Sequence, residues 1–239
     1  MEYTNNLREE YNREGYVIVE DFLPTDVYNE MIDIFYKGEY VEIAQSFDDR
    51  YELWQNKGGD MHAIPDKCFP STDEVYTNHF WGSAEVSHNL KVLNVYKENI
   101  KSFIEFILDE QVGKGRHQAT KYNKNGKDFL RVHVDDYMGY IGYVMHFQKE
   151  TWKYDWGGLL QMSIGIASHE HRERSKDIKT FLPQPNRLIV HNHSMGIPHW
   201  VTPVNSWSKE NRYTLTGFCI RSDDEVPETW RSRNDYSIL

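Results

Sequence analysis

The stretch FLRVHVD, residues 129–135, is expected to form a β-strand and decides how the rest of the chain is interpreted. In a strand, residues i and i+2 point to the same face, so His133 and Asp135 would present an imidazole and a carboxylate together. Asp136 would point to the opposite face. The spacing therefore predicts a strand that carries two metal ligands side by side.

A third ligand is expected from a distant strand at His199, which stands between Pro198 and the run Trp-Val-Thr-Pro. Three such ligands close one triangular face of an octahedron and leave three positions open. Two histidines and one carboxylate with open positions are the ligand set of iron(II) oxygenases. We therefore predict that His133, Asp135 and His199 are the metal ligands and the catalytic residues.

A cationic side chain follows further along the chain at Arg212. If residues 212–220 form a strand, Arg212 shares a face with Thr214, Thr216 and Phe218. A guanidinium offers a rigid fork that binds a carboxylate through two hydrogen bonds, and Thr214 can add a hydroxyl. This end of the strand is expected to hold an anionic ligand.

A competing set of ligands is present in the same region. His191 and His193 have the same i, i+2 spacing and could form a zinc site with His199, which would favour hydrolysis. His169 and His171 lie in the charged insertion 168–180, which is expected to be a solvated hairpin loop rather than a source of ligands.

The pattern along the chain changes near residue 116. Before it, a strand is expected at 15–19, a helix from Pro24, irregular structure at 45–88 and a helix at 89–111 that Gly113 ends. After it come short β-rich runs separated by turns: 116–122, 128–135, 139–148, 158–166, 187–193, 199–204 and 212–220. Short strands with long connections favour a jelly roll over an alternating α/β sheet.

The predicted fold class is mainly β with flanking helices (α+β), a double-stranded β-helix, or jelly roll, buttressed by N-terminal helices. We expect one domain over residues 1–239. Its parts would be a strand and supporting helices at 1–115, a catalytic core at 116–221 and a C-terminal tail at 222–239.

Composition restricts the surroundings in which the protein works. The formal net charge of −10 argues against a protein that binds nucleic-acid phosphates or an anionic membrane. The sequence contains no run of about 18 apolar residues, so no membrane span is predicted. The polar start contains no apolar signal segment. Cys68 and Cys219 are too few for a disulfide framework. We expect a reducing, cytoplasmic setting.

Several short motifs occur together in a recognisable order. They are YNKNG at 122–126, FLRVHVD at 129–135, DWGGL at 155–159, NRLIV at 186–190, PHWVTP at 198–203 and RYTLTG at 212–217. Across residues 116–221 this order resembles the 2-oxoglutarate/Fe(II)-dependent dioxygenases, in particular their prolyl 4-hydroxylase-like branch.

The resemblance implies cofactors and further site residues. It implies Fe(II), 2-oxoglutarate as co-substrate and O2, with ascorbate as a stimulating reductant. Arg212 and Thr214 would anchor the distal carboxylate of 2-oxoglutarate, and Tyr122 would donate a hydrogen bond to it. His146 stands where the branch often has a tyrosine that contacts the co-substrate. Arg212 follows His199 by 13 residues, a few more than usual, so a longer loop must be accommodated.

The implied reaction is hydroxylation of an unactivated C–H bond with release of succinate and CO2. The substrate would be a small molecule or a peptide, with a prolyl residue or a small amino acid suggested by the branch, and the oligomeric state is left open. The alternatives are a cupin-like metal-binding protein and a metallo-hydrolase that does not use 2-oxoglutarate. Arg212 and Thr214 argue against the cupin-like alternative, and the resemblance of residues 186–190 to a framework strand of the family argues against the zinc site of a hydrolase.

Overall fold

The computed structural model describes residues 3–46, 76–133, 135, 139–164, 177–226 and 237–238. Its strands join in one 12-stranded sheet. They are β1 (Tyr16–Val19), β2 (Val41–Ser46), β3 (Tyr76–Ser83), β4 (Val112–Tyr122), β5 (Phe129–His133), β6 (Ile141–His146), β7 (Leu160–Ile164), β8 (Asp177–Phe181), β9 (Leu188–Asn192), β10 (His199–Val201), β11 (Arg212–Arg221) and β12 (Ser237–Ile238).

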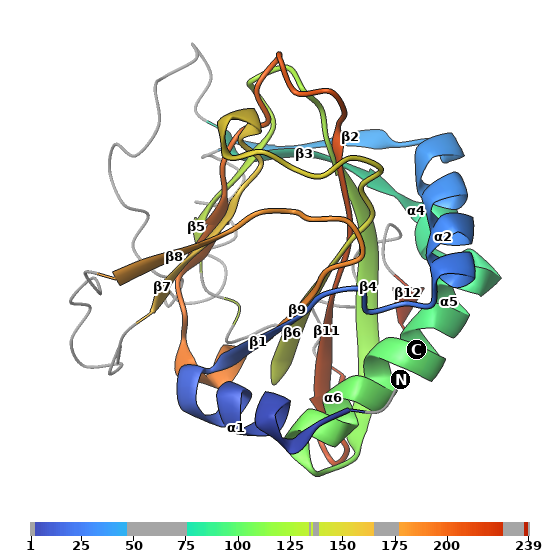
Figure 1. Ribbon diagram of the computed structural model, residues 1–239, viewed down its shortest axis with the longest axis vertical. Coiled ribbons are helices and arrows are strands. Elements are labelled where there is room, and N and C mark those ends of the chain that lie inside the picture. The colour runs from blue at the N-terminus through green and yellow to red at the C-terminus, as the bar shows by residue number, and fades with distance from the viewer. Residues whose placement is uncertain are drawn as a thin grey trace.

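The sheet is antiparallel throughout its described pairings and curls upon itself. The strand order is β1-β9-β6-β11-β4-β3-β5-β10-β7-β8, with β2 beside β3 and β12 beside β4. Strands β5, β7 and β8 lie on one side of Figure 1, across from β6, β11 and β4. Buried residues of both halves, such as Val144 and Ile189 of one and Met162 and Val201 of the other, share one apolar cluster.

Helices cover the outer face of the larger half of this sheet (Figure 1). They are α1 (Asn5–Glu14), α2 (Thr25–Lys37), α4 (Ala84–Ser87), α5 (Leu90–Val95), a π-helical turn (Tyr96–Ile100) and α6 (Lys101–Leu108). Apolar helix residues such as Phe35 and Phe103 belong to the same buried cluster as Met145, Val190 and Leu215 of the sheet. Side chains alternate along a strand, so the residues of β6, β9 and β11 that do not face the helices point into the interior of the curled sheet. The predicted mainly β core with buttressing helices is confirmed.

Several local predictions were wrong. The helix expected at 89–111 is divided by the π-helical turn and ends before Asp109, whose left-handed backbone (φ 59°) stops it ahead of Gly113. The polar segment that forms α1 was not predicted as a helix. Residues 45–88 are not irregular throughout, because they contain the end of β2, β3 and α4, while 47–75 lie outside the described residues.

The charged insertion at 168–180 was expected to be a hairpin loop, but its last four residues belong to a strand. Residues 177–181 form β8, which pairs with β7, and 165–176 lie outside the described residues together with His169 and His171. Strand β4 begins four positions earlier than expected, at Val112. Within the tail, Ser237 and Ile238 pair with β4. None of the helices described is long and apolar enough to span a membrane.

Candidate metal centre and anion-binding site

Two neighbouring strands position the predicted metal ligands. β5 ends at His133 and β10 begins at His199, and these two residues are direct partners in the antiparallel ladder. Cross-strand partners share a face, so the two imidazoles lie side by side with their ring centres 4.2 Å apart. Asp135 lies just beyond the end of β5 and not within the strand as expected.

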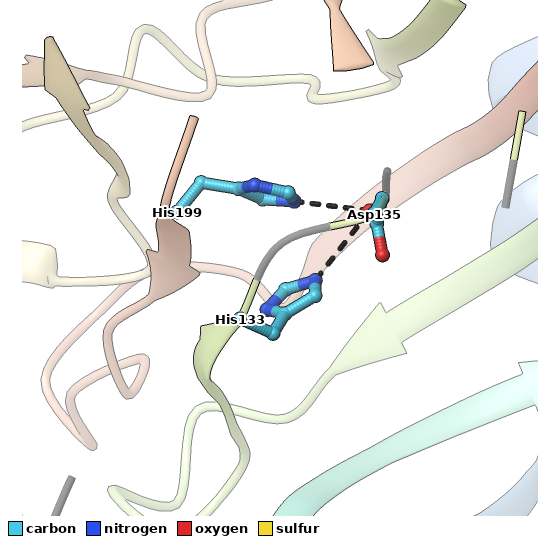
Figure 2. Close-up of side chains that lie close together, drawn as sticks. All are labelled: His133, Asp135 and His199. Carbon is cyan, nitrogen blue, oxygen red and sulfur yellow. Dashed lines mark ion pairs between the residues drawn. The ribbon is translucent and has the colours of Figure 1, made fainter. Parts of the chain in front are cut away.

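The three side chains converge on one point, as Figure 2 shows. Oδ2 of Asp135 lies 3.2 Å from Nε2 of His199 and 3.6 Å from Nε2 of His133. One ligand atom from each residue lies within 4.8 Å of the other two. Asp135 and His199 are buried, and His133 is partly buried. The predicted triad is therefore brought together in space.

Backbone carbonyl groups fix how the two imidazoles are oriented. Nδ1 of His133 donates to the Arg131 carbonyl at 2.7 Å, and Nδ1 of His199 donates to the Ile197 carbonyl at 3.0 Å. In a neutral imidazole, a proton on Nδ1 leaves Nε2 with a lone pair. Both lone pairs then point toward the Asp135 carboxylate, an arrangement of three acceptors that a divalent cation satisfies. The donor set and its orientation fit a metal ion.

The electrostatics of the metal-free triad agree with this fit. Burial by itself raises the pKa of Asp135, but His133 and His199 outweigh it and hold this pKa well below its usual range. Burial, together with the neighbouring His199, lowers the pKa of His133. Burial also opposes protonation of His199, yet its hydrogen bond to Asp135 raises the pKa of that imidazole. The carboxylate is thus charged and ready to bind a cation.

Arg212 lies at the start of β11, directly opposite Tyr122 of β4. Its guanidinium carbon lies 5.0 Å from the centre of the Tyr122 ring. The side chain is 1 % exposed, and burial lowers its pKa to about 10. Within the described part of the chain Arg212 forms no ion pair, and its Nε has no hydrogen-bond partner. A buried guanidinium without an anion is costly, so this position calls for an anionic ligand.

Hydroxyl and imidazole groups surround the guanidinium position. Thr214 is the ladder partner of Thr120 on β4 and of His146 on β6. The two threonine hydroxyl groups are hydrogen-bonded to each other. His146 is fully buried, and in the described ranges of the chain neither of its ring nitrogens has a hydrogen-bond partner. Burial, together with the charge of Arg212, holds the pKa of His146 well below its usual value.

Side chains that face the interior place the anion-binding end and the triad on the same side of the sheet. Arg212 and Phe218 point to the same face of β11 because no irregularity interrupts the ladder between them. The ring of Phe218 lies 5.3 Å from that of His193, and His193 lies 4.7 Å from His191. His191 in turn lies 5.2 Å from His199. Both ends of the site therefore open on the same interior.

The structure does not support the competing zinc ligands. Among the described residues, His133, Asp135 and His199 alone form a group with metal-ligand spacing. His191 and His193 are buried nearby but lie outside this group. The sequence left them as rival ligands, while the resemblance of residues 186–190 to a framework strand of the family implied that histidines after it border the pocket, which is where the structure places them. Asp136 lies outside the described residues.

The long connection between β10 and β11 is anchored on both sides. Asn205 Nδ2 and Trp207 Nε1 donate to the carbonyl of Asp155 at 2.7 and 2.8 Å. Glu210 accepts hydrogen bonds from two backbone N–H groups that follow β6. These contacts accommodate the extra residues and hold Arg212 at the start of its strand.

Gly157 supports the same connection through its backbone. It has φ 68° and ψ −150°, a conformation open almost only to glycine. It pairs with Val204, and a Cβ at this position would lie 2.0 Å from the Pro203 carbonyl oxygen. The glycine therefore allows two backbones to approach closely.

Comparisons with known proteins agree with this geometry. Residues 117–220 match the family model described as the 2OG-Fe(II) oxygenase superfamily. No curated protein is significantly similar to the chain in sequence.

Solved structures share the fold at low identity. A prolyl-4-hydroxylase of Pseudomonas putida is 15 % identical with a TM-score of 0.56, covering 90 % of this chain and 97 % of that one. A prolyl hydroxylase of Trichoplax adhaerens, in complex with a hypoxia inducible factor oxygen degradation domain peptide fragment, is 15 % identical with a TM-score of 0.58, covering 95 % and 90 %. An oxidoreductase of the 2OG-Fe(II) oxygenase family from Burkholderia pseudomallei is 12 % identical with a TM-score of 0.59, covering 93 % and 92 %.

Proposed function

Because residues 117–220 place this chain in the 2OG-Fe(II) oxygenase superfamily, we propose that it hydroxylates an unactivated C–H bond and releases succinate and CO2. The observation that carries the proposal is the pairing of two features on one interior. A histidine–aspartate–histidine triad is oriented for a cation, and a buried Arg212 lacks an anion within the described chain. Fe(II) would bind at the triad, and the 2-oxoglutarate dianion would supply the anion for Arg212.

His133, Asp135 and His199 would hold the iron. Their three donors occupy one face and leave positions open for other ligands. Iron and 2-oxoglutarate, when bound, supply the oxygen activation that C–H hydroxylation needs. The carbonyl groups of Arg131 and Ile197 keep both Nε2 atoms directed at the metal position.

Arg212 would bind the distal carboxylate of 2-oxoglutarate, since a guanidinium can donate two parallel hydrogen bonds. Tyr122, the ladder partner of Arg212, and Thr214, two residues further along β11, lie near this position and can add hydroxyl donors. His146, neutral and without a hydrogen-bond partner in the described part of the chain, can donate one N–H to the same carboxylate. Apolar residues such as Leu160 and Val201 pack in the same interior and exclude water from the co-substrate.

For the substrate we propose a prolyl residue or a small amino acid. The support is the fold shared with two prolyl hydroxylases, one of which was solved with a peptide. We further propose that the chain acts as one domain in the cytoplasm. Its two cysteines do not suit a disulfide framework, and a reducing compartment keeps iron in the Fe(II) state. Ascorbate is expected to stimulate turnover by restoring Fe(II).

Anaerobic titration tests this proposal. The metal-free protein is mixed with Fe(II) and then 2-oxoglutarate, and the weak visible charge-transfer absorbance of the ternary complex is recorded. We expect saturable absorbance at one iron per chain. Freshly purified protein that contains zinc at the triad and gives neither this absorbance nor succinate would point instead to a metallo-hydrolase or a cupin-like metal-binding protein.

A further inference from the structure

Two buried histidines lie beside the metal ligands and have no part in the mechanism above. His191 and His193 are each 3 % exposed, with ring centres 4.7 Å apart. The ring of His191 meets that of His199 edge to face at 5.2 Å. Neither joins the triad, whose ligand atoms form a separate group. These imidazoles therefore border the metal position without binding the metal.

The hydrogen-bonding capacity of this pair is unused. Nδ1 of His191 and both ring nitrogens of His193 are buried and have no hydrogen-bond partner among the residues that the structure describes. Burial lowers the pKa of His193, and the Gly139 carbonyl partly opposes this effect. The carbonyl is not placed to form a hydrogen bond with either ring nitrogen. Buried polar groups in native proteins are almost always paired with protein, water or a ligand. The pair thus calls for a partner that the described chain does not supply.

The sheet makes room for both rings at one position. Gly142 is the ladder partner of His191 on β9 and of Phe218 on β11. A Cβ at Gly142 would lie 2.0 Å from Nε2 of His193 and 2.7 Å from Nε2 of His191. The absence of a side chain lets both imidazoles lie against the backbone of β6 on its inner face. Phe218, at 5.3 Å from His193, forms an apolar wall next to them.

We infer that His191 and His193 form a substrate subsite that holds a neutral hydrogen-bonding group, a hydroxyl or a carboxamide, next to the metal centre. The inference rests on the proposed function, because it places the substrate of that reaction. Each neutral imidazole offers one donor and one acceptor. A hydroxyl or carboxamide both donates and accepts, whereas a carboxylate accepts only and an ammonium donates only. The neutral groups therefore match both rings.

Matched pairs of compounds test the inference. The pairs are L-threonine with L-valine, L-asparagine with L-leucine, and L-tyrosine with L-phenylalanine, each as the free amino acid and between two glycines. Binding is measured by saturation-transfer difference NMR on the anaerobic protein loaded with Zn(II) and 2-oxoglutarate. Succinate release is measured with Fe(II) and oxygen. The variants are His191→Phe, His193→Phe and His193→Gln, with the exposed His88→Phe as control.

We expect at least one polar compound to bind, and to stimulate succinate release, roughly tenfold to a hundredfold better than its apolar partner. Each Phe variant should reduce that preference to about threefold or less, His193→Gln should restore part of it, and His88→Phe should keep it. Melting temperatures show whether each variant is folded. If a Phe variant does not fold, His193→Gln is used in its place.

Three results would overturn the inference: apolar partners that bind equally well, a preference unchanged in the folded variants, or no binding by any polar compound. All three presuppose that the ternary complex forms in the wild-type protein. Failure of that complex to form would contradict the proposed function itself, so the two failures can be told apart.

Discussion

The guanidinium of Arg212 lies 5.0 Å from the centre of the Tyr122 ring, and within the described chain it has no carboxylate partner. Substitution Arg212→Ala should therefore weaken 2-oxoglutarate binding by on the order of a hundredfold or more, since removing the partner of a buried charge costs roughly 3–5 kcal/mol. Iron binding should be nearly unchanged. Anaerobic titrations of each ligand separate the two effects, and Arg187→Ala, at an ion pair with the half-exposed Glu20, is the matched control. Equal 2-oxoglutarate affinity in Arg212→Ala would place the anchor elsewhere.

His199→Ala should remove bound iron and turnover while the fold is retained, because it deletes one of three converging ligands. His193→Ala should keep the iron, because His193 lies outside the triad. Iron content per chain after desalting is the measurement, with melting temperature as a check on folding. Loss of iron from His193→Ala and retention in His199→Ala would show that the triad is assigned wrongly.

The wild-type protein should release succinate slowly in Fe(II), 2-oxoglutarate and oxygen without any substrate. A true substrate should accelerate this release, and we expect a proline-containing or amino-acid compound to do so. Chromatographic assay of succinate over a panel of amino acids, proline-containing peptides and nucleosides provides the test. Protein that binds iron but yields no succinate with any of them would contradict the oxygenase mechanism.

Gly157→Ala should destabilise the fold by roughly 3 kcal/mol, since alanine is strained at this backbone conformation and its Cβ would meet the Pro203 carbonyl. Gly126→Ala is the matched control, because Gly126 also has positive φ but no atom within 4 Å of the added Cβ. It should cost about 1 kcal/mol. Urea denaturation compares the two, and equal effects would rule out the close approach at Gly157.

Acid should destabilise the protein through His117, which is fully buried and whose Nε2 donates a hydrogen bond to the Ser87 carbonyl at 3.0 Å. Burial lowers the pKa of His117 to about 4. The unfolded chain then binds more protons than the folded one between about pH 6.5 and 4, so this contribution to stability is present above pH 6.5 and is lost as the pH falls.

His117→Gln should reduce this acid sensitivity. The difference between unfolding free energies at pH 7.5 and pH 5 should be smaller than in the wild type by about 2 kcal/mol. Substitution of the exposed His88 by Gln should change the difference far less, because burial lowers the pKa of His117 more than the charge of His88 does. An unaltered pH dependence in His117→Gln would mean that His117 titrates normally in the folded protein.

Much of the β core could be predicted from alternation and turns. Strands were expected at the positions of β4, β5, β6, β7, β9, β10 and β11, although their ends differ by several residues. The elements that were missed depend on tertiary contacts. Helix α1 is mostly polar and mean hydropathy gives little sign of it, but Tyr11 is buried in the helix-covered cluster. The sequence predicted that Gly113 ends the helix, but Asp109 takes the left-handed conformation and ends it earlier.

The convergence of His133, Asp135 and His199 was predicted from spacing and from the resemblance, and the structure brings them together. Their roles as iron ligands remain a prediction. The position of His191 against His199 could not be inferred, since it depends on how far the sheet curls and on the space left by Gly142. Such contacts across the interior have no local signal in the chain.

The ladder between β5 and β10 pairs His199 with His133 and becomes irregular one residue further on. A slip of one residue would turn His199 to the other face of its strand. Iron could then bind only when β5 and β10 pair in the register that places His199 beside His133. Metal retention after refolding would therefore report the fraction of chains in which β5 and β10 have paired in the correct register, even where spectra of overall β content are identical.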